Sequence, residues 1–151
     1  MFSFKLYEKE DQPFFEKLIQ DSPAWQEEEC SISDLPSYMQ RYEMMNGQWM
    51  LWYEGERAIG ITFAVDWAPS NEKPWIGTIL VDRQARGKGY GKQIVNKIAE
   101  GYRKEGQDVL FASVPLQRLD WMQFLAMCGF EQFKVEENER NKPYMIMAKP
   151  L

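Results

Sequence analysis

The hydrophobic positions of this chain follow two periods, and the changes of period divide it into strands and helices. Residues 2–6 alternate apolar and polar side chains, which predicts a half-buried strand. Residues 11–19 and 31–45 carry apolar side chains at helical spacing, so each predicts a helix with one buried face. The acidic run at 27–29 lies between these helices and is expected to be a solvated loop.

Apolar runs in the middle of the chain predict a hairpin and then a third strand. Residues 49–53 and 58–65 are two such runs, and the glycine-containing turn at 54–57 joins them into an antiparallel pair. After a turn-rich segment, residues 75–81 form another apolar run that leads directly into a glycine-rich stretch. The spacing then becomes helical from Gly91 onward.

The last third of the chain predicts a strand–helix–strand crossover and a final pair of strands. The helix that begins near Gly91 is stopped by the pair Glu105-Gly106. The elements expected after it are a buried strand at 109–114, a helix at 119–127 closed by Gly129, and strands at 131–135 and 144–148.

Length and charge restrict the class of protein. The chain has 151 residues, which predicts a single domain over residues 1–151. Eighteen basic residues against 23 acidic ones give a net charge of -5, so no overall positive field favours nucleic acid or an anionic membrane as a partner. The N-terminal residues lack a signal-peptide pattern and no apolar stretch is long enough to span a bilayer, so we expect a cytoplasmic protein.

Histidine is absent, and the two cysteines, Cys30 and Cys128, are far apart. The missing histidine excludes Ser-His-Asp and Cys-His catalysis. The cysteines show no metal-ligand spacing, so no metal is expected, and unpaired thiols fit a reducing compartment. Cys128 is expected to be a buried thiol and not an acyl carrier.

The segment Arg86–Gly91, which we term the glycine loop, is the strongest candidate for chemistry. It joins a predicted strand to a predicted helix, whose first N–H groups lack intrahelical partners and lie at the positive end of the helix dipole. Glycines let successive amides converge on an anion, and basic neighbours add charge-assisted contacts. The residues expected to bind a diphosphate are Arg86, Gly87, Lys88, Gly89, Tyr90, Gly91 and Lys92.

A plain flexible turn is the simplest alternative for the glycine loop, and two known phosphate-binding patterns do not fit it. The Walker pattern fails, since it needs a glycine in place of Arg86 and a serine or threonine in place of Gln93. The dinucleotide-binding fingerprint also fails, because its third glycine would fall on Lys92. The strand before the loop, the helix after it and the flanking bases together favour a phosphate site over the plain turn.

The run Leu80–Lys92 resembles the central motif of the Gcn5-related N-acetyltransferase (GNAT) family. That motif is written as Gln or Arg, two residues, Gly, one residue, and Gly or Ala, and Arg86, Gly89 and Gly91 fill it. A second register through Gln84 is also possible, but the distance from the preceding strand favours the first. The resemblance implies an α/β chain of the α+β type: a mixed, mostly antiparallel twisted sheet of about seven strands, flanked by about four helices.

The resemblance also implies a binding site for acetyl-coenzyme A, used as the acyl donor. Its pyrophosphate would lie on the amides of the glycine loop, and its pantetheine arm would pair like an extra strand with the strand before the loop. The implied pantetheine contacts are Ile79, Leu80 and Val81, with Phe124 and Leu125 packing against the arm.

The usual acid and base positions of the family are not kept. The base position reads Trp75, which leaves Asp82 and Glu72 as the nearest carboxylates and candidate catalytic residues. The position of the usual tyrosine acid reads Leu125, so Tyr90, Tyr144 or solvent would have to protonate the thiolate.

Three functions follow. The first is direct acetyl transfer from acetyl-coenzyme A to a primary amine of a small molecule or peptide, and the second is a coenzyme A-binding sensor or interaction module without turnover. The third is a nucleotide-phosphate binder, which selective retention of coenzyme A over ATP would exclude. Family specificity lies in variable segments, here 21–47 and 136–143, and the oligomeric state, monomer or homodimer, stays open. The tryptophans at 25, 49, 52, 67 and 75 either line an aromatic acceptor pocket or fill the core.

Overall fold

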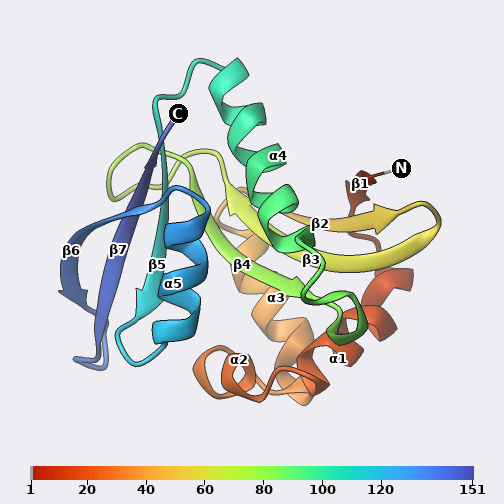
Figure 1. Ribbon diagram of the computed structural model, residues 1–151. Coiled ribbons are helices and arrows are strands. Elements are labelled where there is room, and N and C mark those ends of the chain that lie inside the picture. The colour runs from red at the N-terminus through yellow and green to blue at the C-terminus, as the bar shows by residue number, and fades with distance from the viewer. Residues whose placement is uncertain (1) are drawn as a thin grey trace. The chain divides into compact units, whose positions relative to one another are not determined.

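A computed structural model describes residues 2–151, which form seven strands, five α-helices and three short 3-10 turns (Figure 1). The strands are β1 (Phe2–Leu6), β2 (Gly47–Glu54), β3 (Arg57–Val65), β4 (Trp75–Val81), β5 (Val109–Pro115), β6 (Glu131–Glu137) and β7 (Pro143–Pro150). The helices are α1 (Gln12–Gln20), α2 (Pro23–Glu28), α3 (Leu35–Glu43), α4 (Tyr90–Lys104) and α5 (Leu119–Met127). The 3-10 turns are η1 (Lys9–Asp11), η2 (Ile32–Asp34) and η3 (Arg83–Ala85).

The strands are hydrogen-bonded in the order β1-β2-β3-β4-β5-β7-β6, which is the mixed seven-stranded sheet expected from the sequence. The chain groups into two units along this order. The first unit holds the residues up to Val65 together with Thr78–Gly91, and the second holds Asp66–Gly77 together with Lys92–Leu151.

In the first unit, β2 pairs antiparallel with β1 and with β3. The β2–β3 turn places Gly55 at a φ of 61°, a conformation that favours glycine. The register shifts between Trp52 and Tyr53, which pair with Gly60 and Ala58, so the extra residue of this bulge is Ile59 of β3. The buried Trp52 indole donates a 2.9 Å hydrogen bond to the Thr62 hydroxyl, so this polar group of the core is satisfied.

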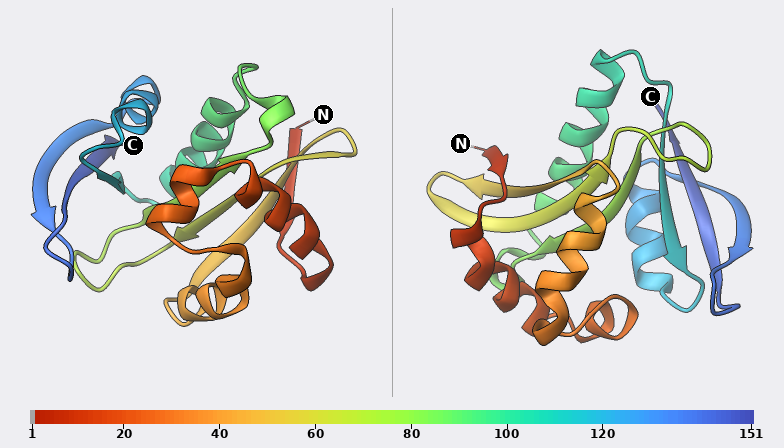
Figure 2. Two further views of the ribbon diagram at one scale, coloured as in Figure 1. Left: turned by 90° about the horizontal axis from the view of Figure 1, so that it is seen from below. Right: turned by 180° about the vertical axis from the view of Figure 1, so that it is seen from behind.

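Helices α1, α2 and α3 lie together in the first unit (Figure 2). Aromatic side chains of α1 and α3 meet β2 and β3 at Trp49 and Phe63, which are directly opposite each other in the register. Trp25 of α2 packs on Phe15 and Tyr38. Gly47 is required at the start of β2, because a Cβ there would collide with the Phe63 ring. These ring contacts join α1 and α3 to β2 and β3.

In the second unit, β7 pairs antiparallel with both β5 and β6, so β6 is the edge strand. The start of β4 pairs in parallel with β5, with Trp75 opposite Phe111, which confirms the predicted crossover through α4. Helix α5 lies alongside β5 and β7 (Figure 1) and contributes the buried side chains of Met122 and Leu125. Gly129 follows α5 at a φ of 94°, as a helix-terminating glycine does.

One element was predicted wrongly. Residues 27 and 28 are not in a loop but belong to α2, which gives the sheet five helices instead of about four. Pro23 occupies the first turn, where a missing N–H costs nothing, and Trp25 is 9% exposed. Burial of this one large side chain holds a short helix whose remaining residues are mostly polar.

Candidate functional site

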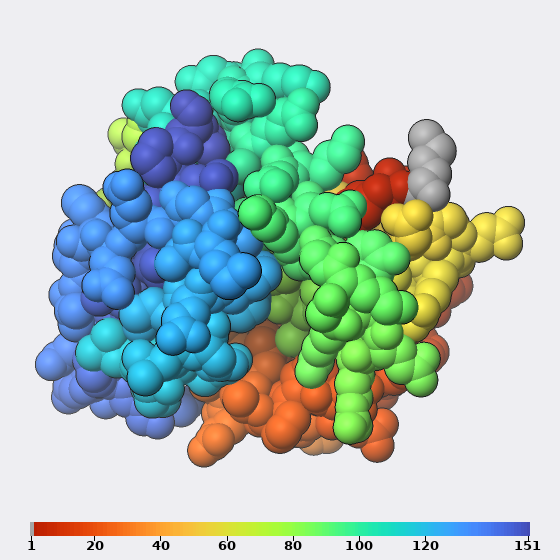
Figure 3. Space-filling model, viewed as in Figure 1, coloured from red at the N-terminus to blue at the C-terminus, as the bar shows by residue number. Residues whose placement is uncertain are grey.

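The glycine loop belongs to the first unit, follows η3 and includes Tyr90 and Gly91, the first two residues of α4. It lies at the surface, in the green part of Figure 3. Gly87 and Gly89 have φ angles of 78° and 81°, and no atom lies within 4 Å of a Cβ built on either residue. The backbone is therefore open to a ligand at both positions and adopts a conformation that side chains disfavour. These features fit a diphosphate at the start of α4.

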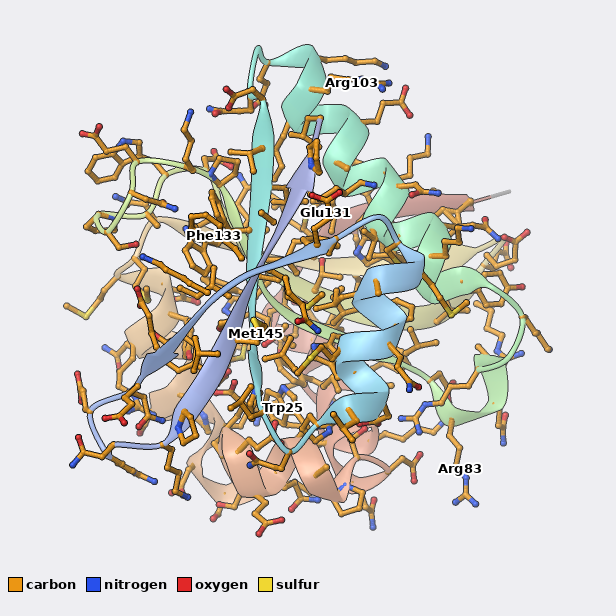
Figure 4. The ribbon with its side chains drawn as sticks, turned by 60° about the vertical axis from the view of Figure 1, so that its left-hand side comes forward. Trp25, Arg83, Arg103, Glu131, Phe133 and Met145 are labelled. Atoms are coloured by element: carbon orange, nitrogen blue, oxygen red, sulfur yellow. The ribbon has the colours of Figure 1, made fainter. Side chains whose placement is uncertain are left out.

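Basic side chains around the glycine loop are not equivalent. Lys88 and Arg83 are exposed, and Arg83 points away from the ribbon into solvent (Figure 4). The Arg86 guanidinium is held by protein groups: Nε donates to the Val81 carbonyl at 3.0 Å and Nη2 donates to the Ser22 hydroxyl at 3.1 Å. Within residues 2–151, Lys88 is thus the loop cation without such anchoring bonds, while Arg86 braces the loop.

The Val81 carbonyl accepts from Arg86 on the side of β4 that is away from β3. The Asp82 N–H donates to the Ile59 carbonyl of β3 at 2.7 Å, and the Val81 carbonyl points in the opposite direction from the same peptide. This is the backbone side that would pair with pantetheine along Ile79, Leu80 and Val81. Arg86 therefore occupies one acceptor of the proposed pairing strip.

Asp82 is a buried anchor of the turn before the glycine loop. It is 3% exposed, and its Oδ1 accepts from the Gln84 N–H at 3.2 Å. Its Oδ2 lies 3.5 Å from Lys17 Nζ and 3.8 Å from Arg57 Nη2. Two cations and a capping bond favour a structural part for this carboxylate, and its role as a base stays a prediction.

The other candidate site residues belong to the second unit. Glu72 is exposed in the turn before β4, has a φ of 62° and donates its N–H to the Ala68 carbonyl. Trp75, at the family's base position, donates its indole N–H to Asn71 Oδ1 at 3.0 Å and stacks on Phe111. The Trp75 side chain has no proton acceptor, and the role of Glu72 as a base stays a prediction.

Helix α5 carries the remaining candidates, and exposed Lys92 lies in the first turn of α4. Leu125 is 1% exposed and forms part of the core, whereas the half-buried Phe124 stacks on Trp121 with ring centroids 5.0 Å apart. A buried leucine has no proton to give, so the acid role is unfilled at this position.

A group that sequence reasoning missed lies at the end of α2. Glu29 accepts a hydrogen bond from the Tyr38 hydroxyl at 3.3 Å, next to a set of packed rings that we term the aromatic cluster. The signal for it was the Ser22-Pro23 helix start followed by Trp25, which marks a helix instead of a loop. The aromatic cluster consists of Phe15, Trp25, Tyr38, Tyr42, Trp49 and Phe63.

The sequence profile of the Acetyltransferase (GNAT) family matches residues 6–130, which include the glycine loop. The chain belongs to the GNAT acetyltransferase family. It is also 40% identical over 136 residues to the uncharacterized protein YkzC of Bacillus subtilis (strain 168), an alignment that covers 90% of this chain and 95% of that protein.

Solved structures show the same GNAT fold. An acetyltransferase from Thermus thermophilus matches with a TM-score of 0.79 and 18% identity, covering 100% of this chain and 97% of that one. A chimera of the spermidine N-acetyltransferase SpeG from Vibrio cholerae and hSSAT matches with a TM-score of 0.74 and 15% identity, covering 99% and 94%. At these identities the likeness concerns the fold alone.

GNAT proteins normally use acetyl-coenzyme A as acyl donor. Over residues 2–151, no group of three or more His, Cys, Asp and Glu side chains is arranged to hold a metal ion. No helix in that range is long and apolar enough to cross a bilayer.

Proposed function

We propose that this protein is an N-acetyltransferase that moves an acetyl group from acetyl-coenzyme A to a primary amine of a small molecule or peptide. The observation that carries the proposal is the glycine loop of a GNAT family chain, with two left-handed glycines in open space at the start of a helix. A diphosphate there would be bound by backbone amides and the helix dipole, with Lys88 adding charge.

The donor's remaining parts would be bound by residues that are named from the family resemblance. The backbone of Ile79, Leu80 and Val81 would pair with the pantetheine arm, and Arg86 would have to leave the Val81 carbonyl if that group is used. The half-buried Phe124 would pack against the arm, whereas Leu125, also named from the resemblance, is 1% exposed and lies in the core. The bound donor supplies an activated acetyl thioester, and the chain's part is to bind it and orient the amine.

Direct transfer is favoured over an acyl-cysteine intermediate, because neither cysteine is a ready nucleophile. Cys30 and Cys128 are both buried, and burial raises the pKa of Cys30 to about 11 and raises the pKa of Cys128. A thiol with a raised pKa carries little thiolate near neutral pH. The free, buried thiols also support a cytoplasmic protein.

The GNAT match runs through both units, which supports our proposal that residues 1–151 act as one acetyltransferase domain. Its acceptor would be a primary amine, the class to which the spermidine named for one structural neighbour belongs. We leave monomer and homodimer as the two alternatives for the active form.

A second candidate function is coenzyme A binding without turnover. It is favoured by Trp75 and Leu125, which fill the family's base and acid positions with side chains that cannot do this work. Release of free thiol from acetyl-coenzyme A in the presence of amines separates the candidates, since only an enzyme produces it.

The decisive experiment is calorimetric titration of acetyl-coenzyme A into the wild-type protein and a Gly89→Val variant. A β-branched side chain at this φ is strained and would block the loop, so we expect affinity to fall at least tenfold. Gly106→Val is the matched control, because Gly106 has a φ of 89° and equally open surroundings at the far end of α4. Equal affinities of the two variants, or equal wild-type affinity for ATP, would contradict the site.

A further inference from the structure

Glu29 faces the aromatic cluster through two tyrosine hydroxyls. The Tyr38 hydroxyl donates to Glu29 Oε2 at 3.3 Å, and the Tyr42 hydroxyl also interacts with the carboxyl group. The other charged groups that act on it are Glu28, beside it in the chain, and Arg41 of α3. Glu29 as a whole is an exposed residue, and its carboxyl group lies where the tyrosine hydroxyls meet solvent.

The surroundings of Glu29 change its acidity in the direction that a base requires. Burial of the carboxyl group raises its pKa from 4.5 to about 7, and the Tyr38 hydrogen bond opposes this rise. A carboxylate that titrates near neutral pH can take a proton from an ammonium group more readily than an ordinary glutamate.

The aromatic cluster also contains an unused polar group. Trp49 is 5% exposed, and its indole N–H has no hydrogen-bond partner among the residues that the structure describes. Buried donors are almost always paired in folded proteins. This donor has almost no accessible surface among the packed rings, so it belongs to the core and is not part of the acceptor site.

The rings beside Glu29 suit a cation. Tyr38 and Tyr42 have ring centroids 4.6 Å apart, and Trp25 meets Tyr38 edge-on at 5.5 Å. The Arg41 guanidinium already lies 6.0 Å from the Tyr38 ring centroid, which shows that this ring accepts a positive charge. An ammonium group at this position would have aromatic faces on one side and the Glu29 carboxylate on the other.

Tyr38 connects Glu29 to strand β4 within the first unit. The Thr78 hydroxyl, 4% exposed, acts on the Tyr38 hydroxyl, which in turn donates to Glu29. Thr78 immediately precedes Ile79–Val81, where the pantetheine arm is proposed to pair. The carboxyl group is thus linked through two hydroxyls to the segment where the thioester would lie.

We propose that Glu29 is the general base of acetyl transfer and that it binds the acceptor, a small organic ammonium ion, where its carboxyl group meets solvent beside Tyr38 and Tyr42. The inference rests on the proposed function. Glu29 takes one proton from the ammonium, the free nitrogen forms a C–N bond to the acetyl carbon, and the C–S bond to coenzyme A breaks. The leaving sulfur takes the second nitrogen proton, so the products are the acetylamine, free coenzyme A and protonated Glu29, which returns its proton to water. Tyr38 is a positioning residue.

The test compares Glu29→Gln with Glu27→Gln, an exposed glutamate two residues earlier on α2. Thiol release is measured from pH 5.5 to 9.5 with acetyl-coenzyme A and spermidine, tyramine or lysine as acceptor. We expect wild-type and Glu27→Gln rates to rise through pH 7, and Glu29→Gln to lose about 100-fold in kcat with unchanged acetyl-coenzyme A affinity. A Glu29→Gln rate within threefold of the control would overturn the inference.

The pH dependence of the Tyr38→Phe rate is a further test, because loss of a purely structural contact would not shift it. The Tyr38 hydrogen bond lowers the pKa of Glu29, so its removal should shift the rise in rate to higher pH. An unshifted profile contradicts the positioning role. If the wild-type protein does not bind acetyl-coenzyme A, the proposed function itself fails; if it binds and turns over but Glu29→Gln does so equally, only the assignment of Glu29 fails.

A second measurement needs no reactive acceptor. In protein labelled with 13C-glutamate, the Glu29 carboxyl signal is assigned by its loss in Glu29→Gln and followed against pH with and without spermidine. A midpoint near 7 that spermidine lowers supports the inference, because a bound cation stabilises the carboxylate. A midpoint below 5, or one that none of the three amines moves, overturns it.

Discussion

The glycine loop consists of six consecutive residues, whereas the aromatic cluster draws side chains from α1, α2, α3, β2 and β3. The glycine loop is exposed, polar and defined by backbone conformation; the aromatic cluster is buried and defined by side-chain packing. A diphosphate needs only amides, a helix end and a positive charge, and a short peptide segment provides all three. Raising the pKa of a carboxyl group by desolvation needs protein atoms around it, and here segments distant in the chain provide them.

The largest expected effect on stability comes from removing the ring at the centre of the aromatic cluster. Trp49→Ala should destabilise the protein by about 3 to 5 kcal/mol, because it leaves a cavity among Phe15, Tyr38 and Phe63. Urea unfolding measures this, with Trp67→Ala as control, since Trp67 is 53% exposed and should cost less than about 1 kcal/mol. Equal costs for the two variants would show that the aromatic cluster is not the packed core described.

Near the glycine loop, the Asp82→Ala variant distinguishes a structural role of this carboxylate from a role as general base. It removes the cap to Gln84 and the carboxylate beside Lys17 and Arg57, so stability should fall by about 2 kcal/mol. The folded variant should keep kcat within about threefold under saturating donor and acceptor. Glu56→Ala, at an exposed turn residue, is the control for stability. A loss of 100-fold or more in kcat with normal stability would instead make Asp82 the base.

The smallest expected effect is the loss of folding stability when the Glu29 carboxyl group ionises. Its folded-state pKa of about 7 lies above the ordinary 4.5, so the native state binds this proton more tightly than the unfolded state. The resulting stabilisation is complete below pH 4.5 and is lost as the pH rises to about 7. Because water screens the exposed part of the side chain, Glu29→Gln at pH 8 should gain about 1 kcal/mol, or about 2 to 4 °C in Tm.

Calorimetric scans at pH 4.5 and pH 8 test this directly. The gain of Glu29→Gln over wild type should be smaller at pH 4.5, and Glu27→Gln should show no such difference between the two pH values. A variant that is less stable than wild type at pH 8 would show that the Glu29 carboxylate stabilises the fold, in conflict with its raised pKa.

The predicted strands and turns are confirmed where the local sequence pattern is strong. The prediction is wrong for α2, a helix that tertiary packing holds without a periodic pattern. The alternation at 2–6, the glycine turn at 54–57 and the apolar run at 75–81 all correspond to observed strands and turns. The run at 27–29 predicts a loop, because its three glutamates show no periodicity. Trp25 alone holds α2, and nothing in the local sequence says what it packs against.

The glycine loop, the family and the order of strands and helices can be predicted from the chain alone, because each depends on residues close together in it. The roles of the charged side chains depend on how distant segments pack. In the folded protein, Asp82 lies beside two cations, and Arg86 donates hydrogen bonds to Val81 and Ser22. Glu29 accepts a hydrogen bond from Tyr38. The pKa and the partners of a carboxylate depend on desolvation and on neighbouring groups. Such a group can be distant in the chain, because Lys17 and Asp82 are 65 positions apart in the sequence.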